Sequence, residues 1–211
     1  ITVVLAKPLL YMHFNKKAEG IALEDYKPGD KLIPFKVVGE YKGTDLVGME
    51  YEQLIPWVKP VELDENGAWK EASAKAFRVI PGDYVTTEDG TGIVHIAPTF
   101  GADDANVARA AGIPSLFMIN KKDETRPMVD LTGKFYLMDE LDENFVKECI
   151  DVDAYKEYQG RWVKNAYDPQ FTVDGKYDEK AAQAAESLDV YICMMMKQAG
   201  LAFKMEKHVH N

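Results

Sequence analysis

The feature that most restricts how this chain can fold is a run of sixteen residues, 89–104, with the sequence DGTGIVHIAPTFGADD. Gly90 and Gly92 free the backbone for a turn, since glycine adopts positive φ angles at little cost. Pro98 ends the β-rich residues that follow, and Gly101 opens a helical stretch. We therefore expect a strand, a tight loop and a helix N-terminus within this run.

Polar side chains in this run are candidates for a role in binding or catalysis. His95 lies in the β-rich stretch 93–96, and two adjacent aspartates begin the helical stretch that ends at Gly112. We expect Asp103 to cap the helix, which leaves Asp104 free to point elsewhere, ionised near the positive helix end. An imidazole and a carboxylate can then face one small concavity.

Composition limits the class of protein. The 211 residues are 46% hydrophobic, which is enough to fill the core of one globular domain, so we interpret 1–211 as a single unit. A net charge of −10 argues against broad binding to a nucleic-acid backbone, which needs a basic face. Cys149 and Cys193 fit reduced thiols in a cytoplasmic protein, and the apolar runs are too short for a membrane span. The absence of tail-like composition at either end predicts an excised segment.

Many short β-rich runs at close spacing predict an α+β fold with a barrel-like mixed β-sheet flanked by helices. A short helix is expected over 9–14, begun by Pro8, with His13 packed among apolar neighbours. Residues 139–158 predict one or two amphipathic helices with a solvated acidic face, and 178–199 predict one helix, or two if Ser187 caps a second. The expected strands occupy residues 1–6, 35–41, 47–54, 76–80 and 93–96, and a loop or hairpin is expected over 59–74.

Several other chemistries lack their required patterns. The glycines around 90–95 lack the third position of a dinucleotide fingerprint, and neither a phosphate-binding loop nor a hydrolase Gly-x-Ser-x-Gly elbow is present. His208 and His210 have no suitably spaced second ligand pair, so we predict no metal site there. The methionines at 194–196 have the spacing of core residues, and we interpret them as packing.

The run GTGIVHIAPTFGADD closely resembles the signature of the editing domain inserted into isoleucyl-tRNA synthetases. Residues 46–52, LVGMEYE, resemble an upstream element of the same domain, and the helix and strand expected in 178–211 resemble its closing segment. The leucyl and valyl relatives typically have another residue at the position of His95. The resemblance implies the editing-domain fold of the class I aminoacyl-tRNA synthetases.

The same resemblance implies hydrolysis of valine that has been attached to the isoleucine tRNA. Its two catalytic positions correspond to His95, which limits the pocket to the size of valine, and to Asp104, which pairs with the α-ammonium of the amino acid. The implied substrate-binding residues are Thr91, Gly92, His95, Pro98, Phe100 and Asp104. Thr91 and Gly92 allow close backbone approach, while Pro98 and Phe100 hold the loop rigid. A positioned water attacks the ester, since no residue resembles a general base.

The implied partners are the 3′ end of the mischarged tRNA and the rest of the synthetase chain, with no membrane contact. Editing needs no cofactor or metal, whereas the full-length synthetases use ATP and magnesium. The family's threonine-rich pocket segment lies upstream of the residues that resemble Ile1 to Ala6, so we expect weak hydrolysis by this segment alone. Two alternatives stay open: a catalytically silent scaffold that positions tRNA, and a free-standing deacylase that acts in trans.

Overall fold

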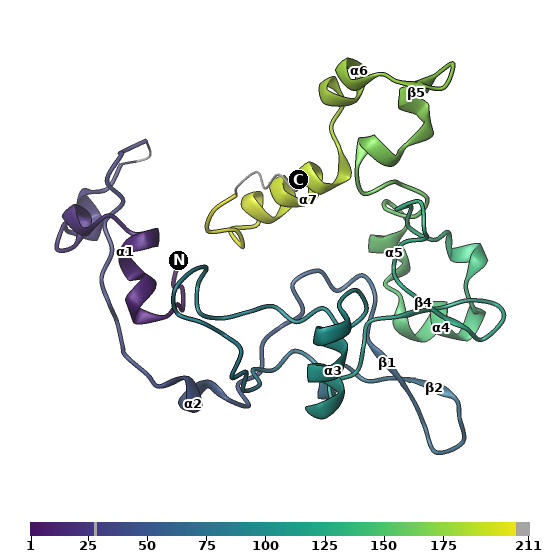
Figure 1. The fold of residues 1–211 in the computed structure, drawn as a ribbon, viewed down its shortest axis with the longest axis horizontal. Coiled ribbons are helices and arrows are strands. Elements are labelled where there is room, and N and C mark those ends of the chain that lie inside the picture. Colours follow the sequence, from purple (N-terminus) through teal and green to yellow (C-terminus); the bar gives the residue numbers. More distant parts are fainter. Residues whose placement is uncertain (28, 206–211) are drawn as a thin grey trace. The chain divides into compact units, whose positions relative to one another are not determined.

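The computed structural model describes residues 1–27 and 29–205. The chain divides into two compact units, each described here by itself. Unit 2 consists of Thr2–Glu52 and Phe77–Ile96, and unit 1 contains Gln53–Ala76 and the chain from Ala97 onward, together with Ile1. Helices and short antiparallel strand pairs occur together, which confirms the predicted α+β class (Figure 1).

The helices and strands are short. The α-helices are α1 (Leu10–His13), α2 (Gly43–Leu46), α3 (Ala102–Ala110), α4 (Glu143–Cys149), α5 (Val152–Tyr155), α6 (Glu179–Ala184) and α7 (Leu188–Gln198). The strands are β1 (Val61–Leu63), β2 (Trp69–Glu71), β3 (Met118–Ile119), β4 (Thr125–Arg126), β5 (Thr172–Val173) and β6 (Lys176–Tyr177). Within residues 1–27 and 29–205 the strands pair as three two-stranded antiparallel sheets, and none of these sheets closes into a barrel. The predicted barrel-like sheet is therefore not confirmed.

In unit 2, two of the predicted strands run against each other without forming a regular ladder. The amide of Gly48 donates to the carbonyl of Val79, the amide of Val79 donates to Met49, and the amide of Tyr51 donates to Phe77, at 2.8–2.9 Å. Phe77 has a φ of +50°, in the left-handed region that extended strands avoid. This residue interrupts the pairing, which leaves a single bridge between Glu50 and Arg78.

Two other predicted strands, 1–6 and 93–96, are not strands in the structure. The Thr91 hydroxyl donates to the carbonyl of Ile93 at 3.0 Å, and the Ile93 amide lies 3.4 Å from the same hydroxyl. Such local side-chain bonds compete with a strand ladder for the backbone groups. The predicted strand 35–41 is likewise reduced to one bridge, between Phe35 and Glu19.

In unit 1, the predicted hairpin and helices are present. β1 and β2 form the hairpin expected within 59–74, with Val61 opposite Glu71 (Figure 1). The stretch 139–158 forms α4 and α5, and their N-caps are Asp142 and Asp151. Most of the acidic residues in this stretch are exposed, as expected for a solvated face, and two of them also cap helices.

The core of unit 1 is an aromatic and aliphatic cluster. The rings of Trp57 and Tyr158 stack with their centroids 3.6 Å apart, and the Tyr155 hydroxyl donates to the carbonyl of Tyr136 at 2.8 Å. Burial of these rings contributes to the hydrophobic stabilisation of the unit. The buried members are Trp57, Val58, Val61, Met118, Ile119, Phe135, Leu141, Phe145, Cys149, Ile150, Tyr155, Tyr158 and Leu188.

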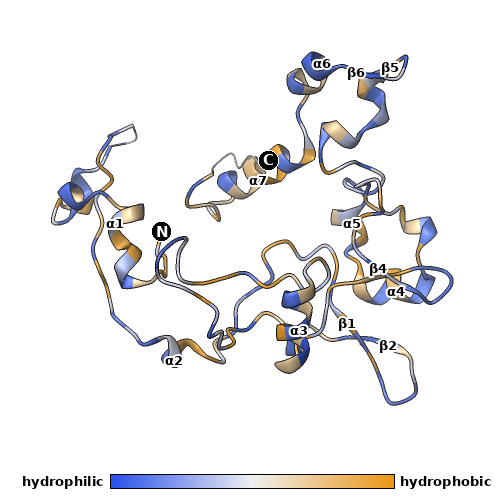
Figure 2. Cartoon of the chain, viewed as in Figure 1, coloured by the Kyte–Doolittle hydropathy of each residue, from blue (hydrophilic) through white to orange (hydrophobic). Residues whose placement is uncertain are grey.

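The stretch 178–199 forms two helices, α6 and α7, with Ser187 at the N-cap position of α7. α7 carries hydrophobic and hydrophilic residues together (Figure 2), and Met195 packs against the core cluster, as predicted for the methionine run. The predicted closing strand and the His208–His210 pair fall partly or wholly on residues 206–211, outside the described part of the chain. Among the described residues, no helix combines the length and apolar character needed to cross a bilayer.

Candidate functional site

The three residues Gly90, Thr91 and Gly92 form a tight loop in unit 2, which we call the glycine loop. Gly90 has a φ of +61° and Gly92 a φ of +73°, so both positions use the backbone freedom that only glycine has at low cost. A Cβ added to Gly92 would lie 2.5 Å from the Cβ of Ala6, so this glycine also permits close packing. The turn predicted from the two glycines is confirmed.

The glycine loop is held by the start of the chain. The amide of Ala6 donates to the carbonyl of Thr91 at 2.8 Å. Nε2 of His13 lies 2.6 Å from the carbonyl oxygen of Gly90. A carbonyl oxygen only accepts hydrogen bonds, so Nε2 carries the proton and donates. His13 is partly buried, and its Nε2 has a backbone carbonyl as partner, while its packing among apolar neighbours stays a prediction.

His95 follows the glycine loop by three residues and is exposed. It lies in unit 2, in a stretch that belongs to no helix or strand. Its flanking residues Val94 and Ile93 are 52% and 47% exposed, so this stretch presents apolar surface beside the imidazole. Such a surface can contact a small aliphatic side chain.

Asp104 belongs to unit 1 and lies in the first turn of α3, with a defined partner. Its Oδ2 accepts a hydrogen bond from the amide of Ala97 at 2.9 Å. Gly101 occupies the N-cap position, so the prediction that Asp103 caps the helix is wrong. Asp103 already lies inside the first turn, from which its side chain cannot cap the amides that follow. Asp104 is accordingly not free, because its carboxylate folds back onto the residues before the helix.

The turn that precedes α3 holds this carboxylate in place. The carbonyl of Ala97 accepts from the amides of Phe100 and Gly101 at 3.0 and 3.2 Å. A Cβ on Gly101 would lie 3.2 Å from Oδ2 of Asp104, so a glycine leaves room for the folded-back carboxylate. The Thr99 hydroxyl donates to the carbonyl of Leu116 at 2.8 Å and anchors the turn.

The remaining predicted residues lie on the same turn. Pro98 is partly buried, and Phe100 is 67% exposed. The exposed ring packs little within the chain, so it is available to contact a ligand. The structure thus brings Thr91 together with Gly92 in unit 2, and Pro98 and Phe100 together with Asp104 in unit 1. The predicted cavity shared by His95 and Asp104 stays a prediction.

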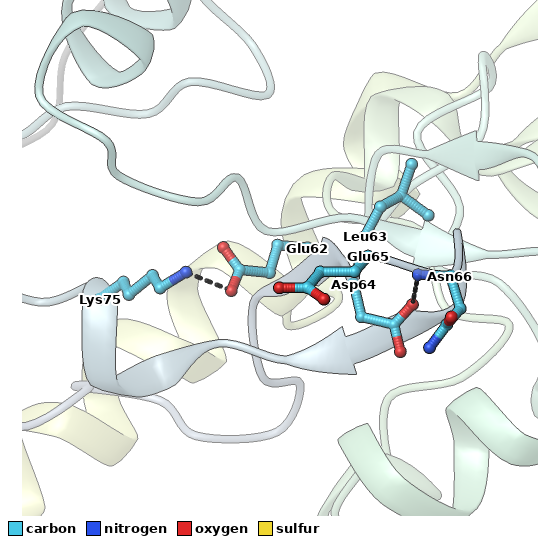
Figure 3. A pocket seen from close by; sticks show the side chains of 6 residues that line it. All are labelled: Glu62, Leu63, Asp64, Glu65, Asn66 and Lys75. Carbon is cyan, nitrogen blue, oxygen red and sulfur yellow. Dashed lines mark hydrogen bonds and ion pairs between the residues drawn. The ribbon is translucent and has the colours of Figure 1, made fainter.

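Among the described residues, one surface depression, of about 530 Å³, lies on the β1–β2 hairpin and is lined by Glu62, Leu63, Asp64, Glu65, Asn66 and Lys75 (Figure 3). Lys75 forms an ion pair with Glu62. Hydrogen bonds from the amides of Ala68 and Asn66 hold the pKa of Asp64 below its ordinary value. These carboxylates therefore already have partners that fold the hairpin, and we assign the depression no function.

Within residues 1–27 and 29–205, no three histidine, cysteine or acidic side chains gather closely enough to hold an ion. In unit 1, the carboxylate of Asp104 can bind a cation. In unit 2, the imidazole of His95 can contact an aliphatic side chain, and the backbone groups of the glycine loop can position a water molecule.

The contributions of three residues to the candidate site were missed by sequence reasoning. Ala6 and His13 support the glycine loop from more than seventy residues away, and neither belongs to a motif. Gly101 is the third residue whose role only the structure reveals, because it accommodates a carboxylate three positions later. No local signal in the sequence could have identified the partners of Ala6 and His13.

Comparison with known proteins places the chain in a family. It is 82% identical over 211 residues to the isoleucine–tRNA ligase of Bacteroides thetaiotaomicron, 67% to that of Bacteroides fragilis and 49% to that of Porphyromonas gingivalis. Each match covers 100% of this chain but only 17–18% of the relative. No protein-family model matches the chain.

These matches define the class first: the chain belongs with the aminoacyl-tRNA ligases, enzymes of protein biosynthesis. Within that class it belongs to the isoleucine–tRNA ligase family, as a segment that spans less than a fifth of the length of its relatives. The chain is therefore part of a larger synthetase.

Proposed function

We propose that this segment is the editing domain of an isoleucine–tRNA ligase and that it hydrolyses valine from mischarged isoleucine tRNA. The observation that carries the proposal is the carboxylate of Asp104, held at the start of α3 within a motif that resembles the editing signature. The similarity of the whole chain to isoleucine–tRNA ligases supports this assignment.

The proposed activity compensates for the limited ability of one pocket to distinguish isoleucine from valine. A pocket built for isoleucine rejects valine, which lacks one methylene, by only about 1–3 kcal/mol, and isoleucine–tRNA ligases are the standard example of that limit. A second site that admits valine and excludes isoleucine multiplies the discrimination. The second site must therefore exclude side chains larger than that of valine.

We assign the recognition of the amino group to Asp104. The Ala97 amide uses Oδ2, and among the described residues Oδ1 has no hydrogen-bond partner. A protonated α-amino group beside the positive end of a helix needs a counter-charge, which Oδ1 supplies. The turn around Ala97 fixes the carboxylate, so little ordering is required when the substrate binds.

We assign the size limit to His95. Its imidazole, beside the exposed Val94 and Ile93, forms the wall that contacts the aliphatic side chain of valine. Thr91 and Gly92 bring the backbone close to the ester, and Pro98 and Phe100 shape the rim. A water molecule positioned by backbone groups and substrate hydroxyls attacks the ester carbonyl, so catalysis depends on positioning more than on proton abstraction. The proposal invokes no cofactor for this step.

We further propose that the antiparallel contacts between residues 48–51 and 77–79 are part of a larger, barrel-like sheet in the complete ligase. Their backbone hydrogen bonds have the antiparallel pattern already. The exposed residues Val37 and Val38 are our candidates for a further strand of that sheet.

Asp104→Asn tests the assignment of the ammonium site. Asparagine keeps an oxygen that accepts from the Ala97 amide but removes the charge, so the turn is retained while the counter-charge is lost. We expect hydrolysis of valyl-tRNA by the intact ligase to fall by 10- to 100-fold, since a hydrogen bond to a charged group contributes about 1.5–3 kcal/mol. Deacylation of purified valyl-tRNA for isoleucine gives the rate.

Asp103→Asn is the matched control, because Asp103 is exposed and neighbours Asp104 in the same turn. It should retain the wild-type rate of hydrolysis. If the intact wild-type ligase hydrolyses valyl-tRNA and Asp104→Asn does so equally fast, the assignment of Asp104 is wrong. If deletion of the segment leaves hydrolysis unchanged, the segment is a scaffold and the editing proposal fails.

A further inference from the structure

His13 is positioned to control the glycine loop, although it is 77 residues away from Gly90 in sequence. The loop has positive φ angles at both glycines and carries few side-chain atoms that could lock it in place. Its position therefore depends on what binds its carbonyl groups. Each of its three residues contacts the start of the chain.

The contacts are specific to each residue of the loop. The carbonyl of Gly90 accepts from Nε2 of His13 at 2.6 Å, and the carbonyl of Thr91 accepts from the amide of Ala6 at 2.8 Å. The Cα of Gly92 packs so closely against Ala6 that a Cβ there would lie 2.5 Å from the Ala6 Cβ. We call Ala6 and His13 the N-terminal clamp.

The clamp is itself anchored. The 3₁₀ turn Lys7–Leu9 and α1 connect Ala6 to His13, and Leu9 in this connection is 1% exposed. The amide of Leu9 donates to the carbonyl of Ala6 at 2.9 Å, which ties the turn to the first clamp residue. A buried leucine and a hydrogen-bonded turn thus hold the two clamp residues in fixed relation to each other.

The glycine loop is connected to the residues that precede His95. The Thr91 hydroxyl donates to the carbonyl of Ile93, so the loop and the residues before His95 are joined by a local hydrogen bond. Displacing a positioning group by about 1 Å can cost as much as 100-fold in rate. A substitution in the N-terminal clamp is therefore expected to displace His95, the wall of the proposed pocket.

We propose that His13 is a positioning residue for the glycine loop and, through it, for His95 in the hydrolysis of valyl-tRNA. The inference rests on the proposed editing function for its effect on rate, but the structural coupling between His13 and the loop can be measured independently. His13 touches neither the reacting ester nor the amino acid in this account. Its Nε2–H acts on a backbone carbonyl.

Two substitutions in the intact ligase separate the hydrogen bond from the volume of the ring. His13→Phe keeps a ring of similar size without a donor, and His13→Gln keeps an N–H donor at a comparable distance from the backbone. Met12→Gln, at an exposed neighbouring position, is the matched control. Hydrogen exchange followed by mass spectrometry reports on peptides that contain Ala6 and the glycine loop.

We expect His13→Phe to speed exchange in both peptides and to lower kcat for valyl-tRNA by about tenfold with little change in KM, because a lost hydrogen bond costs roughly this factor. His13→Gln should restore slow exchange and most of kcat, and Met12→Gln should match wild type. The proposal is overturned if His13→Phe leaves exchange and kcat unchanged, or if His13→Gln is as impaired as His13→Phe. Absence of hydrolysis by wild-type ligase would reject the editing function, whereas unaltered exchange would reject the role of His13.

Discussion

At Asp104, a single carboxylate serves a structural and a proposed chemical role through different oxygens. Oδ2 accepts from the amide of Ala97, and this bond defines where α3 begins relative to the preceding turn. Oδ1 is the group that we propose binds the substrate ammonium. The division explains why an asparagine, which keeps one acceptor and loses the charge, is the informative replacement.

Cys149 illustrates how burial alone determines the chemistry of a residue. It is 3% exposed in the core of unit 1. Desolvation, followed by the negative charges of Glu148 and Glu71, raises the pKa of its thiol from 9.0 to about 11. The thiol is therefore a poor nucleophile near neutral pH, which agrees with the structural role expected for a reduced cysteine.

This shift predicts a loss of stability in alkali. Between pH 9 and about 11 the unfolded chain releases the thiol proton while the folded chain retains it, so the free energy of unfolding falls as pH rises. Below pH 9 the contribution is fully present. Urea titrations of the chain, followed by tryptophan fluorescence, would measure this decline.

Cys149→Ala removes the titrating group and is the control for this prediction. The difference in unfolding free energy between wild type and variant should shrink across the same pH interval. Tyrosines with raised pKa values contribute equally to both proteins and cancel in the difference. A difference that is constant from pH 8 to 12 would contradict the assigned pKa shift.

At the scale of elements, aspartate side chains cap three helices of unit 1, namely α4, α5 and α6. Asp142 accepts from the amide of Phe145 at 2.9 Å, Asp151 from Ala154 at 3.0 Å, and Asp178 from Ala181 at 3.0 Å. Each bond satisfies an amide that the first helical turn leaves without a partner. The acidic composition of this region therefore serves helix initiation.

Asp142→Ala should lower the free energy of unfolding by about 1 kcal/mol, because it removes the cap of α4 beside the buried Phe145. Asp142→Asn, which keeps an acceptor, should cost only a few tenths of a kcal/mol. Urea unfolding of the chain monitored by tryptophan fluorescence compares them. Equal stability of Asp142→Ala and wild type would show that the cap does not contribute.

The helices could be predicted from sequence because their signals are local. The periodic apolar residues of 178–199 and the glycine after α3 both lie within the elements they define, and α3, α6 and α7 appear where expected. Strands depend on partners elsewhere in the chain. The β-branched residues of 1–6 and 93–96 have strand propensity, but the structure gives them no ladder, and Thr91 takes the backbone groups of Ile93 instead.

For the molecule as a whole, the core lies in unit 1, whereas the buried hydrophobic residues of unit 2 are Leu9, Ala18 and Phe35 among those the structure describes. The composition indicated enough apolar residues for a core, but it did not indicate how the buried ones are divided between the two units. Packing of Met195 against the core was predictable from helical spacing, while the stacking of Trp57 on Tyr158 was not, since these rings are about a hundred residues apart in sequence.

The candidate site shows the same contrast. One motif of sixteen residues was enough to identify His95 and Asp104 as candidate site residues and to predict the turn at the glycine loop. The supports of that motif were not, because Ala6 and His13 approach the loop only through the fold of unit 2, and Ala97 binds Asp104 only through a turn before α3. Motifs identify reactive groups, and long-range contacts position them.

The central claim is that His95 forms a wall of the editing pocket and excludes amino acids larger than valine. His95→Ala in the intact ligase tests this claim most directly. The measurement is the ratio of hydrolysis rates for valyl- and isoleucyl-tRNA at equal concentration. Removing the wall should let isoleucine enter and reduce the ratio by 10- to 200-fold, the factor associated with about 1–3 kcal/mol for one methylene. An unchanged ratio, with valyl-tRNA still hydrolysed at the wild-type rate, would contradict the claim.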